Sequence, residues 1–277
     1  MADIPVALAA SPGSSVIVSE WPSTGAATTI SELDSRRIGV CVARAPSLTH
    51  ESLAEANEFC LRHDIDLLIA RCRAEDTLSM QCLEADGFRL MDTLVSWRRS
   101  LDRPAPVERS GQENGTIVQP IGPADEEMVC RIAAQAFQGY NGHYHTDPRL
   151  DQQQASEVYV SWAMRCCREP DAADLLLGAW RDGELVGFLA LKDLGQGLCT
   201  VPLAAVAPQT QGQGVLRSLL AAVVRWLSER DYTAVEYDCV LTNIAAQKAL
   251  ARTGFEMSRS AHTLHKWYDR PLDERHR

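Results

Sequence analysis

Residues 203–220 read Leu203-Ala-Ala-Val-Ala-Pro-Gln-Thr-Gln-Gly-Gln-Gly-Val-Leu-Arg-Ser-Leu-Leu220. The first part has the small and β-branched residues of a strand, and the last part has apolar residues at helical spacing. Pro208 has no backbone N–H and ends the strand, whereas Gly212 and Gly214 permit backbone angles that a Cβ disfavours. Successive amides can then point the same way at the positive end of a helix. This pattern predicts a loop that binds a pyrophosphate group.

A second motif follows this loop along the chain. The spacing Val206-x-Pro208-x-x-Gln211-Gly212-x-Gly214 is followed by Asn243-x-x-Ala246 and Gly254-Phe255. The two motifs resemble the acyl-CoA loop and the next helix and strand of the GNAT N-acyltransferase superfamily. The resemblance implies that acetyl-CoA or another short acyl-CoA is bound by Ala205, Val206, Gln211, Gly212, Gln213, Gly214, Val215, Leu216, Arg217, Asn243 and Ala246.

One position in the loop departs from the family pattern. Leu216 stands where most members have Gly or Ala. A register that starts at Gln209 makes Gly214 that residue. We prefer the register that starts at Gln211, because it also fits the Val-x-Pro spacing and the Ser-Leu-Leu that follows.

Composition excludes several classes of protein. The 277 residues suffice for two domains, and the formal charge of −10, without any basic run, argues against nucleic-acid binding. The nine cysteines form no CxxC pair and no Cys/His metal spacing, so we expect reduced thiols and no metal. No apolar stretch reaches membrane-spanning length, and residues 1–15 lack the basic start of a secretory signal. We therefore expect a cytoplasmic protein that has no membrane partner.

An internal repeat organises the chain. Asp64-Ile-Asp-Leu-Leu-Ile-Ala-Arg-Cys72 aligns with Asp231-Tyr-Thr-Ala-Val-Glu-Tyr-Asp-Cys239 at an offset of 167 residues (231 − 64), which also places Gly87-Phe88 on Gly254-Phe255. Upstream, the first copy is five residues shorter, and residues 47–51 replace the glycines. The first half therefore resembles an incomplete GNAT unit, and we expect only the second copy to bind CoA.

From the repeat we expect a tandem GNAT-like fold of the α/β class, built on a mixed sheet. We expect an N-terminal arm over 1–30 with a strand at 16–21, a partial GNAT-like domain over 31–101, a linker over 102–115 and a catalytic GNAT domain over 116–277. Strands are expected at 38–43, 116–119, 175–181, 185–192, 198–206 and 235–241, and a final pair within 255–267. Helices are expected at 50–63, 125–137 and 215–230. A further helix is expected to begin after Asn243, which is a natural N-cap, and to end before Gly254. This order of elements resembles that of the GNAT superfamily. The resemblance implies a sheet whose strands separate at the place where the acyl thioester and the amine meet.

Candidate catalytic groups lie on the strand before Asn243. Alternation places Glu236, Asp238 and Val240 on one face of that strand. Asp238 lies five residues before Asn243, where some GNAT enzymes that acetylate peptides carry a glutamate base, and a solvated carboxylate is the alternative interpretation. Many members have a tyrosine acid seven residues after the asparagine, but this chain has Leu250 there. Tyr237, His143 or His145 are the candidates to replace that acid.

A histidine-rich segment is the candidate acceptor loop. It contains His143-Tyr144-His145-Thr146-Asp147-Pro148 and is followed by Tyr159-x-x-Trp162. The pattern resembles that of nucleotide-linked 4-amino-sugar N-acyltransferases of the dTDP-fucosamine type, which also pair a degenerate half with a complete one. The resemblance implies that the acceptor is bound by His143, Tyr144, His145, Asp147, Tyr159 and Trp162. The alternative is a structural loop with a Tyr/Trp pair in the core.

The leading hypothesis is acetyl transfer from acetyl-CoA to the amine of a small molecule, here a nucleotide-linked amino sugar. A peptide or protein N-acetyltransferase is the second hypothesis. The third hypothesis is a non-catalytic protein that binds acyl-CoA as a regulator or scaffold. It is favoured because Leu250 replaces the tyrosine of many family members and because the first copy of the repeat has no glycine loop. A homodimer is compatible with all three.

Overall fold

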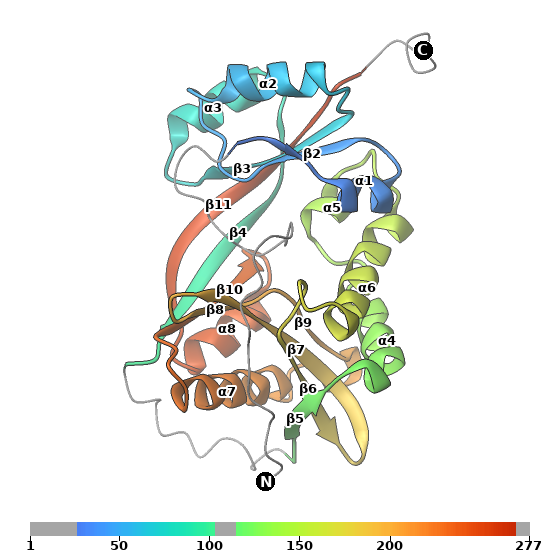
Figure 1. Cartoon of the computed structure of the whole chain (residues 1–277), viewed down its shortest axis with the longest axis vertical. Coiled ribbons are helices and arrows are strands. Elements are labelled where there is room, and N and C mark those ends of the chain that lie inside the picture. Colours follow the sequence, from blue (N-terminus) through green and yellow to red (C-terminus); the bar gives the residue numbers. More distant parts are fainter. Residues whose placement is uncertain (1–26, 103–114, 270–277) are drawn as a thin grey trace. The chain divides into compact units, whose positions relative to one another are not determined.

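The strand, helix and strand expected to repeat are all present in the computed structural model, which describes residues 27–102 and 115–269 (Figure 1). The first copy consists of β3 (Leu67–Arg73), α3 (Thr77–Ala85) and β4 (Arg89–Ser100). The second copy consists of β10 (Ala234–Val240), α8 (Ile244–Arg252) and β11 (Glu256–Trp267). The bounds of all three elements agree at the offset of 167 residues, so the repeat predicted from the sequence is confirmed.

Local chemistry explains why both copies fold alike. Asp76 and Asn243 occupy equivalent N-cap positions, and their side chains accept from the amides of Ser79 (3.0 Å) and Ala246 (3.1 Å). A side-chain oxygen at this position satisfies one of the orphan amides of the first helical turn. The N-cap expected at Asn243 is therefore confirmed.

The described residues form two units, and several elements contribute to both. Unit 1 contains residues 95–102, 115–140 and 156–259. Unit 2 contains residues 27–94, 141–155 and 260–269. Each unit therefore combines segments from both halves of the sequence.

Unit 2 is built on four neighbouring strands in the order β1-β2-β3-β11. Besides the elements already given, it contains β1 (Thr29–Ile30), α1 (Glu32–Ile38), β2 (Val42–Ala45), α2 (Leu53–Arg62) and α5 (His143–Thr146). Strand β2 is parallel to β3, whereas β11 is antiparallel to β3 from the pair Ala261↔Arg73 to the pair Trp267↔Leu67. Alternate residues of β3, including Leu68 and Ala70, pack with α2 and α3 (Figure 1), which leaves the opposite face of the sheet to α1 and α5.

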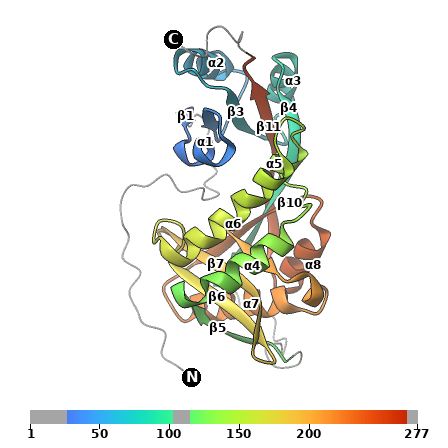
Figure 2. The ribbon, with the colours of Figure 1, turned by 90° about the vertical axis from the view of Figure 1, so that its right-hand side faces the viewer.

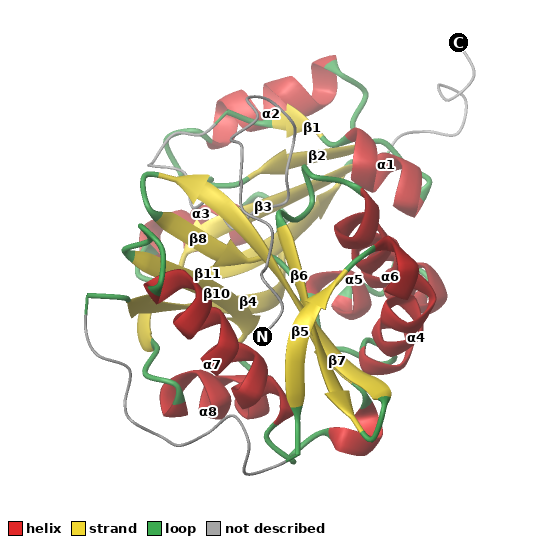
Figure 3. Ribbon diagram, turned by 60° about the horizontal axis from the view of Figure 1, so that its bottom comes forward, coloured by secondary structure: helices red, strands yellow, loops and turns green. Residues whose placement is uncertain are grey.

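Unit 1 has the strand order β10-β8-β7-β6-β5, and β9 pairs with β7. Its further elements are β5 (Ile117–Ile121), η1 (Pro123–Asp125), α4 (Glu126–Ala136), α6 (Gln152–Arg168), β6 (Leu175–Arg181), β7 (Glu184–Gly195), β8 (Leu198–Val201), β9 (Ala204–Val206), η2 (Pro208–Thr210) and α7 (Val215–Ser228). The β8–β10 pair is parallel, whereas β5, β6, β7, β8 and β9 pair antiparallel. Helices α7 and α8 lie on one side of these strands, and α4 lies beside α6 on the other (Figures 2 and 3). The expected mixed sheet is confirmed.

The last strand of each copy lies beside the central strand of the other copy. In unit 2, β11 of the second copy pairs with β3 of the first. In unit 1, β4 of the first copy neighbours β10 of the second, and the Leu101 amide donates to the Thr233 carbonyl at 2.8 Å. The two halves of the sequence therefore exchange their final strands.

Three expected elements differ from those observed. The strand expected at 38–43 is wrong, because Ile38 ends α1, Gly39 adopts a left-handed φ of 79° as its C-cap, and the strand begins only at Val42. The strand expected at 198–206 is divided into β8 and β9, because Pro202 has no N–H for a continuous ladder. The pair of strands expected within 255–267 is one strand, β11, of twelve residues. The strand expected at 16–21 and most of the 102–115 linker lie outside the described residues.

Each unit has its own apolar core, and equivalent residues fill both. Leu83 and Phe88 are buried in unit 2, and their repeat partners Leu250 and Phe255 are buried in unit 1. All nine cysteines are free thiols, and six of them are buried. Over 27–102 and 115–269, no helix combines the length and apolarity needed to span a bilayer, and no group of three or more metal-ligating side chains is gathered.

Candidate active site

The sheet of unit 1 parts between β9 and β10. Strand β8 is parallel to β10 from the pair Ala234↔Leu198 to the pair Tyr237↔Val201, and β10 then continues to Val240. Strand β9 continues the path of β8 but pairs only with β7 among the described strands. One edge of β9 therefore has no neighbouring strand, as the expected separation of the strands requires.

The ladder of β9 determines which amides face this open edge. The Ala207 amide donates to the Val186 carbonyl at 2.9 Å, and the Leu203 carbonyl accepts from the Ala190 amide at 2.8 Å. Because alternate residues of an antiparallel strand bond to the same neighbour, the odd-numbered residues of this segment point toward β7. The N–H groups of Ala204 and Val206 then point to the open edge, so Val206 is a better donor to a thioester oxygen than Ala205.

The backbone N–H groups at the N-terminus of α7 have no capping side chain as acceptor. Its N-cap is Gly214, with a left-handed φ of 83°, and Gly212 has a φ of 74°. The first amide with a helical acceptor is that of Ser218, which donates to the Gly214 carbonyl at 3.0 Å. The amides of Val215 and Leu216 precede it and have no acceptor inside the helix. This end of α7 fits a phosphate-bearing co-substrate such as CoA.

An arginine that the sequence interpretation missed holds the glycine loop in place. Arg181, at the end of β6, donates to the Gln213 side-chain oxygen at 2.6 Å and to the Gln213 carbonyl at 2.9 Å. Its Nε also donates to the Thr116 hydroxyl at 2.8 Å. Gln211 is fixed separately, because its side-chain amide donates to the Val206 carbonyl at 3.1 Å. The loop is therefore tied to the sheet at two points.

The corresponding loop of the first copy uses its amides internally. Leu48 donates to the Arg71 carbonyl (2.7 Å), Thr49 to the Ser52 hydroxyl (3.1 Å), and His50 to the Ser79 hydroxyl (2.8 Å). These three donors are consequently not presented to a ligand, which agrees with the expectation that only the second copy binds CoA.

The candidate acid and base on β10 have different surroundings. Asp238 is half-buried, on the face of β10 opposite the apolar core. Tyr237 is part of that core, and its burial, together with the charges of Cys239 and Tyr140, raises the pKa of its phenol well above the usual value. Leu250 is fully buried in the same core, so that position of α8 provides no acid.

An aromatic group lies where α4 meets α6. Phe137 stacks on Tyr159, with ring centroids 4.3 Å apart, and Tyr140 packs edge-on against both rings. Tyr159 is buried, whereas Trp162 on α6 is half-buried. Of this predicted Tyr/Trp pair, Trp162 therefore has the greater exposure to solvent.

The predicted residues His143 and Asp147 lie in unit 2, on either side of a third group, His265. His143 Nδ1 is 3.0 Å from His265 Nε2, and His265 Nδ1 is 2.7 Å from Asp147 Oδ2. Trp267 also donates to Asp147 Oδ2 at 2.9 Å. Burial raises the pKa of Asp147, but hydrogen bonds from His265, the Arg149 amide and Trp267 outweigh burial and lower it. Burial, followed by the charge of His265, holds the pKa of His143 well below 6.5.

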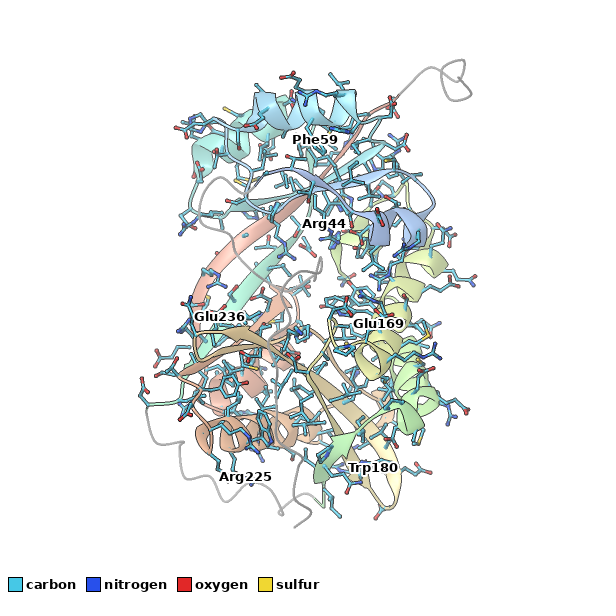
Figure 4. The ribbon with its side chains drawn as sticks, in the orientation of Figure 1. Arg44, Phe59, Glu169, Trp180, Arg225 and Glu236 are labelled. Carbon is cyan, nitrogen blue, oxygen red and sulfur yellow. The ribbon has the colours of Figure 1, made fainter. Side chains whose placement is uncertain are left out.

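Tyr144 belongs to a second buried group of unit 2. Its hydroxyl donates to Asp34 at 2.9 Å and accepts from Arg44 (labelled in Figure 4) at 2.6 Å. Burial opposes ionisation of Asp34, but the charge and hydrogen bond of Arg44 lower the pKa of its carboxyl to about 2. His145 is half-buried, and burial lowers the pKa of its imidazole.

The structure therefore divides the predicted site residues between two units. Unit 1 contains Ala205, Val206, Gln211, Gly212, Gln213, Gly214, Val215, Leu216, Arg217, Tyr237, Asp238, Asn243, Ala246, Tyr159 and Trp162; unit 2 contains His143, Tyr144, His145 and Asp147. The sequence interpretation missed Asp34, Arg44, Arg181 and His265. Their partners lie up to 122 residues away along the chain, so no local motif marks them.

Comparisons with known proteins agree with this geometry. Residues 131–255 match the acetyltransferase (GNAT) family. A mycothiol acetyltransferase of Tsukamurella paurometabola is 29% identical over 191 residues, which cover 66% of this chain and 60% of that relative. The chain thus spans less than two thirds of this relative's length.

Solved structures share the fold at low sequence identity. A GCN5-related N-acetyltransferase from Sphaerobacter thermophilus aligns with a TM-score of 0.59 and 17% identity, over 87% of this chain and 76% of that one. Another from Kribbella flavida aligns with a TM-score of 0.55 and 15% identity, over 84% of each chain.

The family match covers the uncapped helix, the glycine loop and β10 with Asp238. Members of this family generally use acetyl-CoA as co-substrate. Residues 131–255 of this chain are therefore similar to an acetyltransferase domain of the GNAT family.

Proposed function

We propose that the chain transfers the acetyl group of acetyl-CoA to the primary amine of a small molecule, with acetyl-CoA bound by unit 1. The observation that carries the proposal is the uncapped N-terminus of α7 beside the open edge of β9. The first feature suits the pyrophosphate of CoA, and the second offers the Val206 N–H to the thioester oxygen. In the first copy, residues 47–51 contain no glycine, and the amides of Leu48, Thr49 and His50 are bonded within the chain.

The reaction needs few protein groups. The amine nitrogen attacks the thioester carbonyl carbon, the carbon–sulfur bond breaks, and the thiolate of CoA leaves. Holding both reactants together supplies a large part of the rate enhancement. Asp238 accepts the proton that the amine loses, because it is the carboxylate on β10 next to the parted edge and a free alkyl amine is mostly protonated at neutral pH. A dedicated acid is not required, since a thiol is acidic enough to leave as the thiolate.

The acceptor we propose is a nucleotide-linked amino sugar. Support comes from the sequence resemblance of residues 143–148, Tyr159 and Trp162 to the dTDP-fucosamine type of acyltransferase. A second acceptor is favoured by the mycothiol acetyltransferase relative, namely the unacetylated form of mycothiol. Peptide acetylation and acyl-CoA binding without catalysis are the competing functions.

A mass-spectrometric screen tests these functions directly. Purified protein is incubated with acetyl-CoA and a panel of nucleotide amino sugars, unacetylated mycothiol and amine-bearing peptides. The expected result is one acetyl group added to a small-molecule amine, together with release of free CoA. Acetylation of peptides alone contradicts the proposed acceptor class, and tight acetyl-CoA binding without any product favours the non-catalytic function.

A further inference from the structure

Two arginines share one buried carboxylate on the face of β10 that carries Asp238. Glu236 (labelled in Figure 4) accepts from Arg98 Nη1 on β4 at 2.9 Å and from Arg259 on β11, whose Nη2 and Nη1 lie 2.7 and 3.3 Å from the carboxylate. All three residues belong to unit 1. The Glu236 side chain is 4% exposed, whereas those of Arg98 and Arg259 are 47% and 27% exposed. The carboxylate is thus enclosed and the guanidinium groups reach solvent.

The cluster retains positive charge, and Arg98 retains donors that no described residue accepts. Two guanidinium groups and one carboxylate have a net charge of +1, in a chain whose formal charge is −10. A guanidinium has five N–H donors in a planar fork, and Arg98 uses one of them within the described residues. Such a fork matches the geometry of a carboxylate or phosphate group. Glu236 therefore holds both guanidinium groups in place, and Arg98 keeps donors that no described residue accepts.

The cluster lies close to the proposed base. Glu236 and Asp238 are two residues apart on one strand, so they share a face and lie about 7 Å apart along it. We propose that Arg98 and Arg259 bind an anionic group, carboxylate or phosphate, of the amine acceptor. This inference rests on the proposed function, and it specifies the acceptor as an amine that carries an anion a short distance from its reactive nitrogen.

The repeat explains why this site belongs to one copy only. At the offset of 167 residues, Arg98 corresponds to His265, Arg259 to Asp92 and Glu236 to Ile69. The first copy therefore has no arginine pair. Moreover, Arg98 comes from β4, the final strand of the first copy, and it reaches β10 because the copies exchange these strands. The degenerate half thus contributes a specificity-determining residue to the other half's site.

Anion binding can be measured without knowing the acceptor. Calorimetry titrates inorganic phosphate, and separately malonate, into the full chain saturated with CoA, so that the glycine loop is already filled. The variants are Arg98→Gln and Arg98→Lys, which keeps a cation beside Glu236 but removes the fork. Arg131→Gln is the matched control, because Arg131 forms an exposed ion pair with Glu127 (2.9 Å) on α4 of the same unit. Thermal unfolding of each variant establishes that it is folded.

We expect at least one of the two anions to bind the wild-type chain, with affinity reduced about tenfold or more by Arg98→Gln and by Arg98→Lys but not by Arg131→Gln. The anion that binds more tightly identifies the group on the acceptor. No anion binding by the folded wild-type chain, or equal binding by Arg98→Gln, overturns the inference. Anion binding that depends on Arg98, combined with no acetyl transfer in the mass-spectrometric screen, supports this site and counts against the proposed function.

Discussion

The backbone of the glycine loop allows a quantitative test of CoA binding. Gly212 has a φ of 74°, and a Cβ built on it meets no atom within 4 Å, so Gly212→Ala introduces backbone strain without a steric clash. A left-handed conformation costs an L-residue about 1–2 kcal/mol. In the free protein the hydrogen bonds that tie Gln211 and Gln213 to the sheet are exposed and can break as the loop relaxes, whereas a bound pyrophosphate holds the loop in the left-handed conformation. The strain therefore appears in the binding free energy, and a loss of about 5- to 30-fold in acetyl-CoA affinity is expected.

Gly183 provides the matched control for this substitution. It has a φ of 82° in the turn between β6 and β7, and its Cβ position is also open. Gly183→Ala introduces the same strain in the free and the bound protein, so it lowers thermal stability and leaves acetyl-CoA affinity unchanged. Isothermal titration calorimetry with acetyl-CoA measures both variants. Unchanged affinity in Gly212→Ala, or an equal loss in Gly183→Ala, refutes the reasoning.

Three further predictions concern the base, the acceptor and the buried histidines. Asp238→Asn should lower turnover about 10²-fold or more at neutral pH with little change in acetyl-CoA affinity, and a loss within a few-fold would remove Asp238 from the role of base. His145→Ala should raise the KM for the acceptor, or lower kcat, with the KM for acetyl-CoA nearly constant; steady-state kinetics that show the reverse would remove His145 from the acceptor site. The depressed pKa of His143 means that the unfolded chain binds a proton more readily, so stability should fall as the pH drops below about 6.5, by at most about 1.4 kcal/mol per pH unit for this one group. Denaturant titrations between pH 7 and 5 should show a shallower fall in His143→Gln, and identical slopes would assign the acid sensitivity to other groups.

The sequence was sufficient for the local elements of the fold. The predicted N-cap Asn243 and the two Gly-Phe turns are each determined by residues a few positions apart, and the structure shows Asp76 at the equivalent cap position of the first copy. The wrong prediction of a strand at 38–43 also has a local cause. The β-branched pattern outweighed the Ser31 cap and the Gly39 C-cap, which together close α1 at Ile38.

The partners of the last two strands could not be predicted from such signals. Strands β4 and β11 occupy equivalent positions in the repeat, and their residues suit a strand whichever neighbour they have. Only the tertiary structure shows that β11 pairs with β3 and that β4 lies beside β10. The polar contacts that depend on this exchange, such as Arg98 with Glu236 at a separation of 138 residues, were invisible for the same reason.

The exchange of strands also bears on why a half without a glycine loop is retained. Residues 95–102 belong to unit 1, where Trp97 and Leu101 pack against the apolar core that includes β10 and α7. Arg99 donates to the Gly254 carbonyl at 3.0 Å, next to the turn that leads into β11. Without β4, the edge of β10 would expose unpaired backbone groups beside the proposed base. The first copy lacks the glycines of the second, but its last strand is a structural part of the unit that carries the proposed acetyltransferase site.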